Sequence, residues 1–196
     1  MKTTHRTNVE KAARQYVMTR DFDAPRDVVY AAWTDARRLA RWWGPHGITN
    51  PVCEVDPRPG GAYRIEMRSP EGQRYPLKGV FEEIVPGRRL VMSMDTSEHP
   101  AEWHRQLASH RAGGSTAGSP RLVTTVILDE DSGTTRATVR QRFDDDADRD
   151  AFLEMGSVEG WSQSFERLDA VLEEGRVRGG RPRGQKGSRP RVPKRG

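Results

Sequence analysis

The sequence contains a single cysteine, Cys53, among its 196 residues. One cysteine excludes an internal disulfide and is typical of a protein from a reducing compartment. The N-terminal residues lack the apolar run of a signal peptide, and no stretch of the chain approaches the roughly 20 apolar residues that a transmembrane helix needs. The sequence therefore predicts a soluble cytoplasmic protein with no membrane span.

Signatures of covalent catalysis are also missing. The chain has no Gly-x-Ser-x-Gly elbow, and no Gly-rich phosphate loop follows a predicted strand. Cys53 has no histidine beside it in the sequence, which favours a buried, inert thiol. Glu82 and Glu83 are neighbours on a predicted strand and so point to opposite faces, which argues against a carboxylate pair. We therefore predict no catalytic residues, no cofactor and no metal.

The formal net charge of +5 is a local property of the C-terminus. Nine basic residues and no acid lie from Arg176 onward, whereas the other 24 basic residues are outnumbered by the 28 acidic ones. Residues 175–196 have almost no apolar side chains, so we expect a disordered basic tail. Such a tail could contact a polyanion nonspecifically, but no folded nucleic-acid motif accompanies it.

Alternating apolar residues predict an antiparallel sheet of about six or seven strands. Tyr63, Ile65 and Met67 fall on one face of a strand over 62–68, with charged residues on the other face. Residues 1–15 form a polar leader before the first strand. The remaining predicted strands cover 16–22, the region of Cys53, 77–84, 90–94, 122–128 and 135–143.

Helical spacing appears at both ends of this sheet region. Asp27 and Asp35 are predicted to cap two short helices after the first strand, and Gly44-Pro45 ends the second one. Apolar residues at steps of three or four then predict a long C-terminal helix over 148–174. Gly156 and Gly160 each cost about 1 kcal/mol inside a helix relative to alanine, so we expect a bend near them.

Residues 97–120 have the composition of a flexible insertion. Trp103 and Leu107 suit a short helix within it, and a Gly/Ser-rich loop follows. His99, His104 and His110 invite a metal hypothesis, but their spacings match no helical ligand pair and no cysteine completes the set. A solvated loop is the favoured interpretation of these histidines.

Three segments taken in order resemble a known family. They are WTDARRLARWWGPHGITNPVCEVDPRPGGAYRIEM from Trp33 to Met67, GVFEEIVP from Gly79 to Pro86 with Arg89-Leu90-Val91 after it, and Gly160-Trp161 in the predicted long helix. These segments resemble homologues of the activator of the ninety-kilodalton heat-shock-protein ATPase, which belong to the START-like (SRPBCC) superfamily. The resemblance runs over about residues 16–174 and is interrupted at 97–120.

The resemblance implies an α+β helix-grip fold, in which a curved antiparallel sheet surrounds a long C-terminal helix. It also implies a ligand cavity between sheet and helix. The residues expected at this cavity are Trp42, Trp43 and His46 at the mouth, Tyr63, Met67, Phe81 and Met92 on the sheet, and Met155, Trp161 and Phe165 on the helix.

Two alternatives stay open for these residues. Periodicity cannot distinguish a filled core from the lining of a cavity. Trp42 and Trp43 are adjacent on a helix and cannot face the same way, so at least one of them packs in the core while the other can close the mouth. His46 follows the Gly-Pro break beside the mouth, and a surface position is favoured for it. At Gly79 we expect free space that a bulky side chain could fill.

Three functional hypotheses follow. The first is non-catalytic binding of a small apolar or amphipathic molecule, or of a client surface. The second is an enzyme of the cyclase or aromatase type, as in the catalytic branch of the superfamily. The third is a co-chaperone-like module that binds a protein partner. The human-type co-chaperones carry an additional N-terminal domain, whereas only about 15 residues precede the first predicted strand here, which argues against the third hypothesis.

Overall fold

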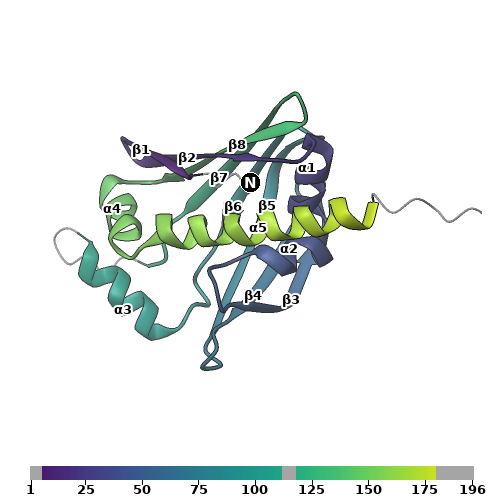
Figure 1. The fold of residues 1–196 in the computed structure, drawn as a ribbon. Coiled ribbons are helices and arrows are strands. Elements are labelled where there is room, and N and C mark those ends of the chain that lie inside the picture. Colours follow the sequence, from purple (N-terminus) through teal and green to yellow (C-terminus); the bar gives the residue numbers. More distant parts are fainter. Residues whose placement is uncertain (1–5, 112–117, 180–196) are drawn as a thin grey trace, which may run out of the picture.

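The computed structural model describes residues 6–111 and 118–179. Its eight strands form one antiparallel sheet in the order β1-β2-β8-β7-β6-β5-β4-β3, which curves around the C-terminal helix α5 (Figure 1). The predicted α+β helix-grip fold is therefore confirmed. The strands are β1 Asn8–Ala12, β2 Gln15–Phe22, β3 Thr49–Val55, β4 Ala62–Arg68, β5 Arg74–Val85, β6 Arg89–Met94, β7 Leu122–Asp131 and β8 Thr134–Phe143.

The predicted number of strands, six or seven, was too small, because one strand lies in the segment predicted to be a polar leader. Strand β1 lies inside residues 1–15 and pairs with β2 through a tight turn at Arg14, whose φ is +53°. All five residues of β1 are exposed. This strand lies at the edge of the sheet, where it is hydrogen-bonded to β2 on one side and has no neighbouring strand on the other. Without a buried face there is no apolar alternation for sequence analysis to detect.

Five helices accompany the sheet: α1 Arg26–Thr34, α2 Ala36–Trp42, α3 Ala101–His110, α4 Asp146–Glu154 and α5 Ser157–Gly179. Asp35 caps α2 as predicted, because its carboxylate accepts a hydrogen bond of 2.9 Å from the amide of Arg38. Asp27 does not cap α1. That helix begins after Pro25, whose fixed φ suits a helix start, and Asp27 lies within the first turn.

The predicted long helix is two helices. Gly156 has a φ of +80°, a conformation that ends α4 and redirects the chain into α5. The bend expected near the two glycines therefore lies at Gly156, while Gly160 stays inside α5. The boundary predicted at Glu174 is too early, since α5 continues to Gly179. The rest of the predicted tail, residues 180–196, lies outside the described residues.

The insertion over 97–120 contains the predicted helix, α3, and this helix is docked on the body. Leu107 is buried, and Arg111 forms a buried ion pair with Asp148 of α4, with Nε 2.7 Å from Oδ1. His110 reaches Glu154 at the other end of α4, over 3.0 Å. The insertion was predicted to be flexible as a whole; the structure instead packs its helix against α4, and residues 112–117 lie outside the described part of the chain.

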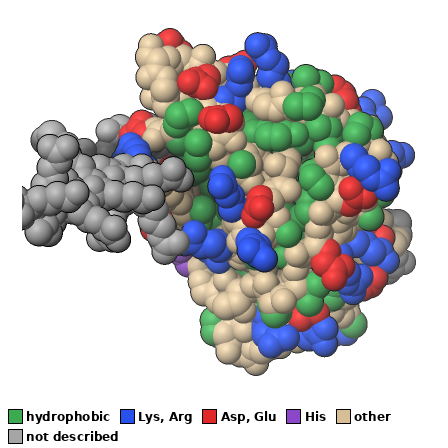
Figure 2. All heavy atoms as spheres, turned by 90° about the vertical axis from the view of Figure 1, so that its right-hand side faces the viewer, with side chains coloured by type: hydrophobic (Ala, Val, Ile, Leu, Met, Phe, Trp, Pro, Cys, Tyr) green, Lys and Arg blue, Asp and Glu red, His purple; other side chains and the backbone are tan. Residues whose placement is uncertain are grey.

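On the face that Figure 2 shows, Lys and Arg side chains are interspersed with Asp and Glu side chains, so this face does not gather positive charge. Within residues 6–111 and 118–179, no helix is long and apolar enough to cross a membrane.

Candidate functional site

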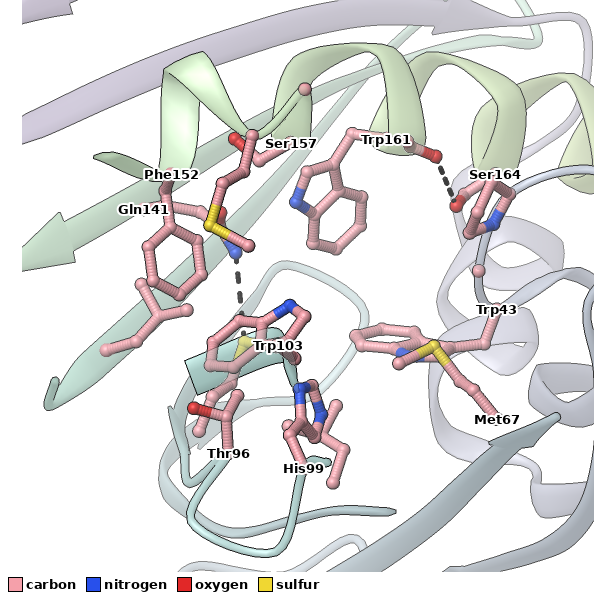
Figure 3. A pocket seen from close by; sticks show the side chains of 18 residues that line it. Trp43, Met67, Thr96, His99, Trp103, Gln141, Phe152, Ser157, Trp161 and Ser164 are labelled. Atoms are coloured by element: carbon pink, nitrogen blue, oxygen red, sulfur yellow. Dashed lines mark hydrogen bonds between the residues drawn. The ribbon is translucent and has the colours of Figure 1, made fainter. Parts of the chain in front are cut away.

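A cavity of about 300 Å³ lies where α5, the α4–α5 junction and the α3 insertion meet the concave face of the sheet (Figure 3). In the described part of the chain, none of its lining residues is Lys, Arg, Asp or Glu. The lining residues are Trp43, Gly44, Pro45, Met67, Leu77, Met94, Thr96, His99, Trp103, Leu122, Gln141, Phe152, Met155, Gly156, Ser157, Gly160, Trp161 and Ser164.

Aromatic rings from four separate segments form much of its wall. Trp43 follows α2, Trp103 comes from α3, Phe152 from α4 and Trp161 from α5. Trp43 and Trp161 meet edge to face with their ring centroids 5.4 Å apart, and Trp103 and Phe152 do so at 5.8 Å. Edge-to-face contacts between aromatic rings are favourable and hold the rings in place. The apolar wall is therefore formed without a ligand.

Arg167 of α5 holds the loop that carries Trp43. Its Nη1 donates to the carbonyl oxygens of Trp43 at 3.2 Å, Gly44 at 2.7 Å and Pro45 at 2.9 Å. Its Nη2 donates to the carbonyl oxygen of Arg41 at 3.0 Å. Burial of the guanidinium lowers the pKa of Arg167 from its usual value, but the group stays protonated. Arg167 and Asn50 together satisfy carbonyl groups at the end of α2 and in the loop after it, since Asn50 Nδ2 donates to the carbonyl oxygens of Ala40 at 3.0 Å and Trp43 at 2.7 Å.

Replacing Arg167 with methionine should lower the free energy of unfolding by about 1–3 kcal/mol, because the carbonyl of the buried Gly44 loses a charged donor, whereas the carbonyls of Trp43 and Pro45 keep donors from Asn50 and Ile48. Arg167→Lys should recover only part of this, since an ammonium group cannot reproduce the planar fork of donors. Urea unfolding measures both changes. Equal stability of Arg167→Met and the parent would show that water replaces the guanidinium without cost.

One edge of the cavity carries a satisfied polar network. The hydroxyl of Tyr16 bonds Gln141 Oε1 and lies 2.9 Å from Ser157 Oγ, and Gln141 Nε2 donates to Thr124 Oγ1 over 3.2 Å. Burial raises the pKa of Tyr16 far above its usual value, so its hydroxyl keeps its proton. Because each of these groups has a partner, the network stabilises the fold without needing a ligand.

A second polar edge is different. Thr96 is only 5% exposed, and its hydroxyl has no hydrogen-bond partner among the described residues. Neither ring nitrogen of His99 has one in the same set. Burial, with a smaller effect from His104, lowers the pKa of His99 to about 4, while Asp95 acts in the opposite direction. The imidazole is therefore neutral near pH 7, with one donor and one acceptor.

The structure brings four of the ten predicted site residues together at the cavity: Trp43, Met67, Met155 and Trp161. Their contact with a ligand stays a prediction. Trp42 is fully buried in the core beside them, and its Nε1 donates to the carbonyl of Ala32 over 2.9 Å. The two adjacent tryptophans thus face different ways, as expected from their spacing.

The other predicted site residues do not line the cavity. Tyr63, Phe81, Met92 and Phe165 are at most 2% exposed and fill the core, so for them the filled-core alternative holds. His46 is exposed outside the mouth, where its Nε2 lies 2.8 Å from Glu166 Oε2 of α5. Its own backbone amide donates to Gln163 over 3.0 Å, so His46 ties its loop to α5.

Sequence reasoning missed the residues that the insertion contributes. His99 was assigned to a solvated loop, but its imidazole lies in the cavity wall, 4.6 Å from the ring of Trp103 between centroids. The spacing of His99 and Trp103, four residues apart at a helix start, was the available signal for this contact. Among the described residues no group of three or more His, Cys, Asp or Glu side chains could hold a metal ion.

Cys53 lies on β3 and packs against the core. Burial, helped by the negative charges of Asp35 and Glu54, raises the pKa of its thiol to about 11. A thiol that stays protonated near pH 7 is a poor nucleophile, which agrees with the inert role predicted for it.

Comparison with known proteins decides the family. The family model described as Activator of Hsp90 ATPase homolog 1-like protein matches residues 23–173. The chain belongs to this family. No curated protein matches it.

Solved structures share the fold of this homologue. A protein from Nitrosomonas europaea is 24% identical and has a TM-score of 0.70, with 86% of this chain and 99% of that chain covered. A protein from Arthrobacter aurescens is 26% identical with a TM-score of 0.70, covering 85% and 91%. One from Chromobacterium violaceum is 28% identical with a TM-score of 0.62, covering 82% and 97%. The family and the fold fit a ligand-binding or interaction module.

Proposed function

We propose that this homologue binds a small, mostly apolar molecule in the cavity between α5, α3 and the sheet, without covalent chemistry. The observation that carries the proposal is the lining: a preformed pocket of about 300 Å³ with aromatic and Met side chains and only uncharged polar groups among its described residues. Ligand pockets range from about 300 to 1,000 Å³ and have this composition, so the occupant would be small.

Binding fits better than the two rival functions. A cyclase-type enzyme needs several groups that give or take protons at the reacting atoms. The network of Tyr16, Gln141 and Ser157 is internally satisfied, which leaves His99 as the one unpartnered titratable side chain among the described lining residues. A co-chaperone would act through its surface and would not need an open cavity. Binding gives the cavity a role and needs no proton transfer.

Gly160 offers a direct test because it lines the cavity inside α5 and a Cβ built there meets no atom within 4 Å. Gly160→Phe should fill the cavity and weaken binding of the neutral fluorescent probe N-phenyl-1-naphthylamine by about tenfold or more. Fluorescence titration of the probe against the folded protein measures the change.

Gly160→Ala is the matched control. It adds one methyl group, should leave probe affinity nearly unchanged, and should raise helix stability by about 1 kcal/mol. The proposal loses its basis if the parent does not bind the probe up to its solubility limit. It is also contradicted if Gly160→Phe, folded by circular dichroism, binds the probe as tightly as the parent.

A further inference from the structure

The unpartnered polar groups of the cavity belong to one short turn between β6 and α3. The amide of His99 donates to the carbonyl of Thr96 over 2.9 Å, which places the two residues on the same turn. Both side chains line the cavity, and Figure 3 shows them on the same side of it, opposite Ser157 and Trp161. The turn therefore places a hydroxyl and an imidazole in the same wall of the pocket.

The imidazole is held in place by aromatic neighbours. Its ring lies edge to face with Trp103 at 4.6 Å and with Tyr75 at 5.7 Å between centroids. These contacts fix the ring plane, and neither supplies a hydrogen-bond partner to its nitrogens. Packing therefore sets the position of His99, and both of its ring nitrogens have no hydrogen-bond partner among the described residues.

Such unpartnered groups are costly in a protein interior. A buried donor or acceptor without a partner costs about 1–3 kcal/mol, and native proteins leave few of them. Three described atoms lack a partner at this turn: Thr96 Oγ1 and the two ring nitrogens of His99. A ligand group that both donates and accepts would satisfy the acceptor nitrogen of His99 and the hydroxyl of Thr96 together.

The electrostatics of the cavity decide what that group is. No Lys or Arg side chain among the described lining residues could neutralise a carboxylate or phosphate, and no Asp or Glu could pair with an amine. Burying an unpaired charge costs far more than burying a hydroxyl. The group is therefore neutral, and a hydroxyl is the smallest neutral group that both donates and accepts. The aromatic walls formed by Trp43, Trp103 and Trp161 favour a planar ring as its carrier.

We infer that His99 and Thr96 are specificity-determining residues that bind the hydroxyl group of a small, neutral aromatic alcohol of the phenol class. The hydroxyl donates to the acceptor nitrogen of His99 and accepts from Thr96. This inference rests on the proposed function, because it names the chemistry of the molecule that would fill the same cavity.

The test compares 2-naphthol with 2-methoxynaphthalene, which has nearly the same shape and no hydroxyl donor. Isothermal titration calorimetry should show the parent binding 2-naphthol about tenfold more tightly, as expected for one net hydrogen bond in a buried site. His99→Leu should bring the two affinities to within about twofold, and His99→Gln, which keeps a donor and an acceptor, should restore part of the preference.

Two further measurements keep the inference testable if His99→Leu does not fold. Thr96→Val removes the hydroxyl that would donate to the oxygen of either compound, so it should weaken binding of both and leave the preference for 2-naphthol largely in place. In the parent, addition of 2-naphthol should shift the ¹⁵N resonances of the His99 imidazole, and 2-methoxynaphthalene should shift them less.

The outcomes separate the two proposals. If neither compound binds the parent, cavity binding itself fails and the inference fails with it. If both compounds bind the parent equally well, if the preference survives His99→Leu, or if Thr96→Val binds both compounds as tightly as the parent, the inference is overturned while cavity binding stands. An imidazole resonance unmoved by bound 2-naphthol would also overturn it.

Discussion

Replacing Trp161 with alanine should lower the free energy of unfolding by about 3–5 kcal/mol, the usual cost of truncating a buried aromatic side chain. Trp161 is only 9% exposed, and its ring lies within 6.0 Å, between centroids, of those of Trp33, Trp43 and Phe165. Truncation would join the space it leaves to the existing cavity, so the neighbouring rings would lose contacts without collapsing.

Chemical denaturation of Trp161→Ala and of Trp103→Ala gives a matched comparison. Trp103 also lines the cavity but is half-buried on the docked helix α3, so its loss should cost less. A Trp161→Ala variant as stable as the parent would mean that α5 does not bury this face. Because a typical domain is stable by only about 5–15 kcal/mol, the expected loss is large enough to be measured well above error.

The fold could be predicted from the sequence because the strands and helices that define it each turn an apolar face toward the core, and this produces a periodic pattern. Strand β4 buries Tyr63 and Ile65 on its inner face, and α5 repeats buried apolar residues at helical spacing. Glu66 on the other face of β4 is also buried, which the alternation did not predict, and it pairs with Arg68 and Arg74. A bend was expected at Gly156 or Gly160 because glycine is unfavourable inside a helix, and it lies at Gly156, whose positive φ costs glycine little. The edge strand β1 has no buried face, so nothing in its sequence distinguished it from a polar leader.

The site was less predictable. Periodicity indicates which face of a strand or helix is apolar, but it does not indicate whether a residue on that face lies in the filled core or lines a cavity. Phe81 and Met92 share the inner face of the sheet with the cavity residues, yet they are fully buried in the core. One polar edge of the cavity comes from the turn before α3, where Thr96 directly precedes the insertion and His99 lies within it. Residues in a turn have no hydrophobic periodicity that could indicate contact with a distant pocket, so only the three-dimensional structure reveals the contribution of Thr96 and His99.

Gly79 is a second position where the sequence pattern did not indicate how closely its neighbours pack. Gly79 was expected to face open space that a bulky side chain could fill, and this prediction was wrong. Gly79 pairs with Tyr63 across β5 and β4, and the ring of Tyr63 lies over it so that the hydroxyl donates to the carbonyl of Ser93 over 2.6 Å. A Cβ built at Gly79 would lie 1.9 Å from that carbonyl oxygen and 2.8 Å from the Tyr63 ring.

Even Gly79→Ala should therefore lower the free energy of unfolding by about 3 kcal/mol or more. The added methyl group must separate β5 from β6 or displace Tyr63, which adds the cost of overpacking to the loss of the Tyr63–Ser93 hydrogen bond. Gly160→Ala, which meets open space in a helix, should change stability in the opposite direction, so the pair separates a steric effect from a general effect of removing glycine. Urea unfolding of both variants measures this. A Gly79→Ala protein with the stability of the parent would show that the strands part freely at this point and that the Tyr63 contact does not hold them together.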